Sequence, residues 1–243
     1  MAALAIVVSA VAVGAWLLLG GSDEPPGPPT AAIVDQLSLT APNPEFAEEA
    51  TALLEEAGYE VDYFPGEEVT VDFYRELPTH GYDLVLLRAH AAGTDFGDDE
   101  KTSDVTLFTS EAVSEKYGKE QRSRLVRGVG YTAQQMEAGD LLFGIPPAFV
   151  EHAMHGDFDG ATVVLMGCDV LRAENMAQAF VERGAGTVVG WDRTVSASHT
   201  DAATLSMLRH MFDEELSVQD AAEAAMAEVG PDPYYDSVFL SYP

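Results

Sequence analysis

The chain has 243 residues, which is enough for one substantial α/β domain or for two small ones. Its formal net charge is −29, from 41 acidic and 12 basic residues, and such a charge repels the phosphates of nucleic acids. The composition therefore argues against nucleic acid as a partner, while the 47% of hydrophobic residues supports a globular core.

The acidic residues are spread along the chain and are not gathered in one tail. This spread predicts a uniformly solvated acidic surface, typical of proteins from salt-loving organisms, in preference to a specific acidic binding site.

The single cysteine, Cys168, excludes an internal disulfide and a zinc site built on paired cysteines. His152 and His155 are spaced to share a metal, but no third ligand has suitable spacing. We expect neither a metal nor a cofactor.

The first residues are the most hydrophobic part of the chain. Residues 2–20 are uncharged and almost wholly apolar, close to the ~20 residues that span a bilayer. A cleaved signal peptide normally has a shorter apolar centre and a basic start, so we expect an uncleaved membrane anchor at residues 1–21; a signal segment of a secreted protein is the alternative. Residues 22–29 are predicted to form a stiff Pro-rich linker, with the domain of residues 30–243 on the outer face of the cell membrane.

From residue 30 onward, strand and helix patterns alternate, which predicts a mostly parallel sheet flanked by helices. The expected strands of this sheet cover residues 31–37, 59–64, 82–90, 161–168 and 186–191. The expected helices cover residues 44–57, 69–77, 146–154, 175–183, 198–212 and 217–229. Asn43 and Ser217 are predicted to cap two of the helices, and Gly58 to end one.

Residues 93–144 are the least regular part of the domain. An acidic loop opens this stretch, and short strands are predicted at residues 105–109, 128–131 and 141–145. We expect the stretch to form a β-hairpin insertion beside the carboxyl edge of the parallel sheet.

Two of the expected strands end in residues with reactive side chains. One continuous Leu/Val run ends at His90, and another ends at Cys168. The carboxyl edge of an open α/β sheet is where reactive groups collect, so the two side chains meet there if their strands are neighbours. A thiol and an imidazole in contact form a nucleophile and its base, and the helix after Cys168 is expected to lower the thiol pKa. Structural roles for a buried cysteine and a hydrogen-bonded histidine are the alternative.

The motifs around these residues resemble a known group. RAHAAG at residues 88–93 and LMGCD at residues 165–169 are similar to the two catalytic motifs of caspase-like cysteine peptidases, which include gingipains, clostripain and CHAT domains. Residues 176–192 resemble the helix, Gly-Ala turn and strand that follow the cysteine in CHAT-type and archaeal members. The resemblance covers residues 30 to about 228. It implies a three-layer sandwich, a protein or peptide substrate, Cys168 as nucleophile and His90 as general base and acid.

The resemblance also suggests the rest of the site. The backbone N–H groups of Ala91 and Cys168 would hold the oxyanion, although the family usually has glycine where this chain has Ala91. Several relatives cleave after basic residues through an acidic pocket, and Asp192 and Asp169 are the candidates for such a pocket here. A catalytically inactive caspase-like or flavodoxin-like binding module is the alternative function.

Overall fold

The computed structural model describes residues 27–93 and 104–243, and its centre is a six-stranded sheet. The strand order is β10-β9-β8-β3-β1-β2, with β10 antiparallel to β9 and the other pairs parallel. The strands are β1 (Thr30–Asp35), β2 (Glu60–Pro65), β3 (Leu84–Arg88), β8 (Thr162–Leu165), β9 (Thr187–Trp191) and β10 (Phe239–Tyr242). The predicted α/β class and mostly parallel sheet are confirmed; the C-terminal strand β10 was not predicted.

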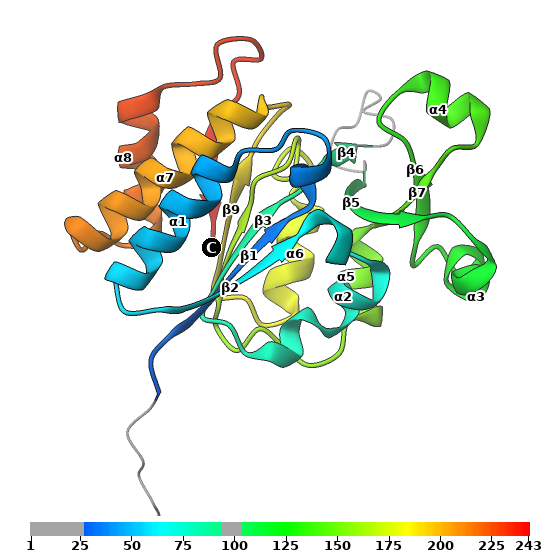
Figure 1. Cartoon of the computed structure of the whole chain (residues 1–243), viewed down its shortest axis with the longest axis horizontal. Coiled ribbons are helices and arrows are strands. Elements are labelled where there is room, and N and C mark those ends of the chain that lie inside the picture. The colour runs from blue at the N-terminus through cyan, green and yellow to red at the C-terminus, as the bar shows by residue number, and fades with distance from the viewer. Residues whose placement is uncertain (1–26, 94–103) are drawn as a thin grey trace, which may run out of the picture.

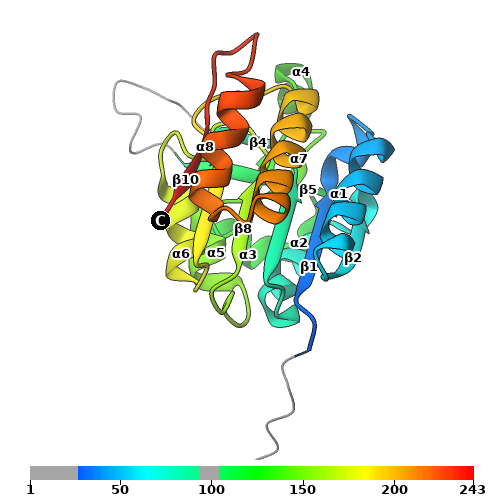
Figure 2. The same ribbon diagram turned by 90° about the vertical axis from the view of Figure 1, so that its left-hand side faces the viewer.

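Helices cover both faces of this sheet and give the domain three layers (Figures 1 and 2). One face carries α1 (Pro44–Glu56), α7 (Ala197–Asp213) and α8 (Val218–Val229). The other face carries α2 (Val71–Glu76), α5 (Pro147–Ala153) and α6 (Asn175–Glu182). Short 3-10 turns complete the connections: η1 (Gln36–Leu39), η2 (Gly66–Glu68), η3 (Leu77–His80) and η5 (Glu115–Tyr117).

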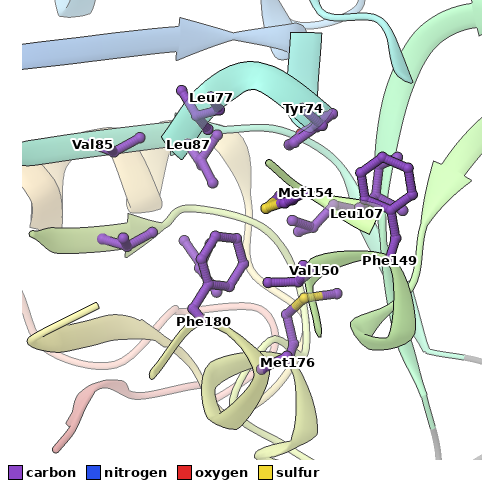
Figure 3. Close-up of a cluster of buried hydrophobic side chains, with 14 of the residues drawn as sticks. Tyr74, Leu77, Val85, Leu87, Leu107, Phe149, Val150, Met154, Met176 and Phe180 are labelled. Atoms are coloured by element: carbon purple, nitrogen blue, oxygen red, sulfur yellow. The ribbon is translucent and has the colours of Figure 1, made fainter. Parts of the chain in front are cut away.

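Successive side chains of each central strand point to opposite faces of the sheet, because the side-chain period of a strand is two residues. In β3, Leu84 and Leu86 pack toward α1, α7 and α8, whereas Val85 and Leu87 pack toward α2, α5 and α6. Figure 3 shows the second of these cores, where Val85 and Leu87 lie near Phe180 and Leu77. Both faces of the strand are buried, which explains its unbroken run of apolar residues.

Local signals place the ends of several helices where the sequence predicts them. The Asn43 side chain accepts a hydrogen bond from the Phe46 N–H and caps α1, and Ser217 accepts one from the Asp220 N–H and caps α8. Gly58 follows α1 with a φ of +91°, a left-handed conformation that glycine adopts without steric cost. These three predictions are confirmed.

The insertion is larger than the predicted hairpin. Four antiparallel strands form a second sheet in the order β4-β5-β7-β6. They are β4 (Ala91–Gly93), β5 (Val105–Ala112), β6 (Arg127–Val129) and β7 (Leu142–Ile145), with α3 (Gly118–Arg122) and α4 (Ala133–Ala138) between them. In Figure 1 the part containing α3, α4, β6 and β7 projects to one side of the main sheet. The three predicted strands correspond to β5, β6 and β7; β4 and both helices were not predicted.

The predicted anchor at residues 1–21 lies outside the described residues, as does most of the 22–29 linker. Within residues 27–93 and 104–243, none of the helices has both the length and the apolar character needed to cross a bilayer. The anchor and the location outside the cell therefore stay predictions.

Candidate active site

The two predicted catalytic residues follow neighbouring strands of the main sheet. β3 and β8 pair in parallel, and paired residues differ by 78 in number, beginning with Leu84 and Thr162. His90 and Cys168 differ by the same 78 and follow the last observed pair, Leu87 and Leu165, by three residues each, so the register directs both toward the same edge of the sheet. The sheet therefore brings together two residues that are far apart in the sequence.

Gly167 allows the two strand ends to approach closely. A Cβ atom built on Gly167 would lie 2.7 Å from the carbonyl oxygen of Ala89 and 2.8 Å from the Cβ of Ala91. Real Cβ atoms essentially never make contacts this short, so a larger residue here would push the strand ends apart. The residue before Cys168 thus packs against the chain on both sides of His90.

His90 and Cys168 line the same small pocket, whose volume is about 40 Å³. Both residues are only partly buried. The other residues around the pocket come from the segments that follow β1, β3, β8 and β9 and from the start of α7: Leu37, Ala89, Met166, Gly167, Val195, Ala197 and Thr200. The pocket lies at the carboxyl edge of the parallel strands, where the sequence placed the reactive groups.

The segment after β1 holds His90 from two sides. The Nε2 atom of His90 lies 2.8 Å from the hydroxyl oxygen of Thr40, within hydrogen-bond distance. The His90 backbone N–H donates to the Gln36 side-chain oxygen at 3.0 Å, and the Gln36 amide donates to the Tyr131 hydroxyl at 2.9 Å. The Tyr131 ring also packs on the imidazole, with 4.9 Å between ring centroids. Sequence reasoning missed Thr40, Gln36 and Tyr131, because their proximity to His90 arises only in the folded chain.

The environment of His90 favours the neutral imidazole. Burial lowers the pKa of His90 below its ordinary value of 6.5, and the positive charge of Arg88 lowers it further. A neutral imidazole is the form that can accept a proton from a thiol.

The thiol of Cys168 is held by the backbone of a single residue. It accepts a hydrogen bond from the Val195 N–H at 3.5 Å and donates one to the Val195 carbonyl at 3.6 Å. Burial raises the pKa of Cys168 above its ordinary value of 9.0, and the nearby carboxylates of Asp169 and Asp232 act in the same direction. The two pKa directions therefore favour a neutral thiol and a neutral imidazole, which line the same pocket.

The expectation that a helix N-terminus lowers the thiol pKa was wrong. The next helix, α6, begins only at Asn175, seven residues after Cys168, and turns occupy the interval. Helix-dipole effects fall off within a turn of the helix end, so desolvation of the sulfur outweighs any such effect here.

A buried ion-pair network lies beneath the His90 segment. Arg88, the last residue of β3, has no exposed surface. Its guanidinium donates to Asp35 at 2.7 Å and to both carboxylate oxygens of Asp201 on α7 at 2.7 and 2.9 Å. It also donates to the Ala41 carbonyl at 2.9 Å, which ties down the segment that carries Thr40. The arginine inside an apolar strand was the only sequence signal for this network.

The backbone around Ala91 leaves an N–H group for the site. The Phe108 N–H donates to the His90 carbonyl at 2.9 Å, and Ala91 is paired with Leu107 in the antiparallel ladder. In such a ladder this bond makes Ala91 and Leu107 a non-hydrogen-bonded pair, so the Ala91 N–H points away from β5. Gly167 lies against the same nitrogen. This N–H group stays a candidate for the predicted oxyanion donor, although Ala91 is not among the residues that line the pocket.

The two carboxylates predicted for a substrate pocket both take part in contacts within the fold. Asp169 is buried and lies 3.4 Å from both Arg172 and the Thr194 hydroxyl. Asp192 accepts a hydrogen bond from the Val238 N–H at 2.7 Å. Asp192 lines a separate hollow, together with Leu171, Arg172 and Arg193. Neither carboxylate is among the residues that line the pocket of His90 and Cys168.

His152 and His155 have separate acidic partners, Glu151 and Glu76, at 3.3 and 2.8 Å. Over residues 27–93 and 104–243, no group of three or more His, Cys, Asp or Glu side chains is arranged to hold a metal ion.

In comparisons with known proteins, no protein-family model and no curated protein sequence matches this chain.

Proposed function

We propose that the protein is a cysteine endopeptidase that hydrolyses peptide bonds with a His90–Cys168 dyad. The observation that supports the proposal is the pairing of β3 with β8, after which His90 and Cys168 both line one pocket. The layered α/β architecture is compatible with a caspase-like sandwich, the fold that the two motifs suggest. Membrane attachment and action outside the cytoplasm belong to the same proposal.

In the proposed reaction, the Cys168 sulfur attacks the carbonyl carbon of the substrate while His90 takes the thiol proton. The carbon–nitrogen bond then breaks, and the imidazolium of His90 returns the proton to the leaving amine. A water molecule next attacks the thioester, with His90 accepting its proton. The carbon–sulfur bond breaks, the carboxylic acid leaves, and the proton on His90 restores the thiol.

The oxyanion of each tetrahedral intermediate needs hydrogen-bond donors close to the sulfur. The proposed donors are the backbone N–H groups of Cys168 and Ala91, and an alanine supplies such a group as well as glycine does. The orientation of the Ala91 N–H, away from β5, supports its role.

The pKa directions favour proton transfer during attack over a preformed ion pair. The pKa of Cys168 is raised and that of His90 is lowered, mainly by burial in both cases, so the neutral forms predominate near pH 7. His90 is then required as a base in the attack itself.

One observation favours the alternative, a catalytically inactive binding module. The Cys168 thiol already has hydrogen bonds to both backbone groups of Val195, as a structural thiol would. In that case the pocket would bind a ligand without chemistry, and His90 would not affect the reactivity of the sulfur.

A mixture of peptidyl acyloxymethyl ketones, which react with catalytic thiols, distinguishes the two functions. Mass spectrometry assigns the label without ambiguity, because Cys168 is the only cysteine. We expect the native protein in concentrated KCl to be labelled, and His90→Gln to slow labelling by about 10²-fold or more. His155→Gln is the matched control, since this exposed histidine pairs with Glu76 and does not line the pocket. Labelling that requires denaturation, or that is equally fast in His90→Gln, would support the binding module.

A further inference from the structure

The pocket beside the sulfur is lined mainly by apolar side chains. Leu37, Met166 and Val195 are buried core residues, and Ala197 adds a methyl group at the start of α7. The Thr200 hydroxyl accepts a hydrogen bond from the Trp191 ring N–H at 2.9 Å, so its bonding capacity is partly used inside the fold. Among the described residues that line the pocket, His90 is the only one with a basic side chain and none is acidic.

The pocket is also small. Its volume of about 40 Å³ is far below the ~300–1,000 Å³ of pockets that enclose whole small-molecule ligands. A methyl or hydroxymethyl group matches this space, whereas a guanidinium, an aromatic ring or a branched aliphatic chain would extend beyond it or displace its walls. A charged group would in addition lose its hydration without gaining a partner of opposite charge.

The chemistry of attack decides which substrate residue occupies this space. The sulfur bonds to a carbonyl carbon, and the side chain of that same residue is attached one atom away, at Cα. The Cα on the other side is one bond further away, beyond the leaving nitrogen, so we assign the hollow beside the sulfur to the side chain on the amino side of the scissile bond. The carboxylates of Asp169 and Asp192, the candidates for an acidic pocket, do not line it.

We propose that the pocket of His90 and Cys168 selects a small uncharged residue, such as alanine, serine or glycine, immediately before the scissile bond. This inference rests on the proposed peptidase function and adds the substrate class. It departs from the cleavage after basic residues that the resemblance suggests.

The test compares single peptidyl acyloxymethyl ketones that differ only in the residue next to the ketone: alanine, glycine, leucine, arginine or aspartate. We expect alanine to react with Cys168 at least ~10-fold faster than leucine, arginine or aspartate, the discrimination typical of a tight pocket. If the arginine, aspartate or leucine probe is fastest and its reaction depends on His90, the peptidase proposal stands and the pocket assignment is overturned. If no probe labels native Cys168, both proposals fail.

A variant that fills the pocket makes the test specific to this space. Ala197 is partly exposed at the start of α7, and Ala197→Leu puts added volume into the pocket without emptying the core. Ser198→Leu is the control on the same helix, because Ser198 is exposed and does not line the pocket. We expect Ala197→Leu to slow the alanine probe by about 10-fold or more and the glycine probe much less. Equal rates with the alanine probe in Ala197→Leu and in the control would overturn the assignment.

Discussion

At the residue scale, the orientation of the His90 ring depends on the hydroxyl group of Thr40, a residue outside both motifs. Thr40 contacts the Nε2 atom of the imidazole, so in the proposed reaction Nδ1 is the nitrogen that would exchange the proton. Thr40 is exposed, so its contribution to the free energy of unfolding is expected to be small. In the proposed reaction it is a positioning residue that acts through His90.

Thr40→Val removes this contact at nearly constant volume. We expect the turnover step to slow by about 10-fold, with little change in substrate affinity, because the imidazole loses its fixed orientation. Thr40→Ser keeps the hydroxyl and should retain most of the activity. The measurement is kcat and KM on a peptide substrate, together with thermal unfolding. A Thr40→Ser variant as slow as Thr40→Val would contradict the role of the hydroxyl.

The pH dependence follows from the environment of His90. The imidazole accepts a proton only when it is neutral, and burial together with Arg88 lowers its pKa below 6.5. Lowering the pKa keeps the base in its active form to lower pH, so activity should fall only below pH 6.5 as the pH decreases. The measurement is the labelling rate of Cys168 between about pH 4 and 8 at constant ionic strength. An acid limb centred above pH 6.5 would contradict this environment.

At the element scale, the sequence predicted the main layers and missed the parts formed by distant contacts. Continuous Leu/Val runs, helix caps and Gly58 carry local information, which is why β1, β3, β8, β9 and their helices were expected. The strand β10 was missed because its pairing with β9 depends on the fold, and the short helices α3 and α4 lack a long apolar period. The same local patterns indicated the two strand ends that carry His90 and Cys168. The contacts of Arg88 and Thr40 could not be predicted, because they join segments that meet only in the folded chain.

The Arg88 network joins β1, β3 and α7 beneath the candidate site, and removing its charge should be costly. Arg88→Met leaves the carboxylates of Asp35 and Asp201 buried without their cation, so we expect the free energy of unfolding to fall by about 3–5 kcal/mol. Arg209→Met is the matched control, because Arg209 also links α7 to α1, through Glu49, but both side chains are more than 40% exposed. Its expected cost is only about 0–1 kcal/mol. Urea unfolding measures both variants, and equal costs would contradict the structural role of the network.

At the scale of the whole molecule, the formal charge of −29 predicts that the stability of the fold depends on salt. The ion pairs of the described residues neutralise only part of this charge, and like charges on one small domain repel each other. At molar salt the Debye length falls to about 3 Å, which screens this repulsion.

We therefore expect the midpoint of thermal unfolding to rise steadily as KCl increases from about 0.1 M toward molar concentrations, because salt screens the repulsion in the folded state. Sucrose at matched osmolality is the control, since it changes hydration without screening charge. A midpoint that responds equally to sucrose and KCl would contradict an electrostatic origin.

The most direct measurement of the central claim is a crystal structure of the protein treated with a peptide aldehyde that ends in alanine. We expect a covalent hemithioacetal on the Cys168 sulfur, with the methyl group in the pocket beside Met166 and the imidazole of His90 against the adduct. Its oxygen should lie about 3 Å from the N–H groups of Cys168 and Ala91. An unmodified sulfur, or an adduct that His90 does not contact, would contradict the proposed dyad.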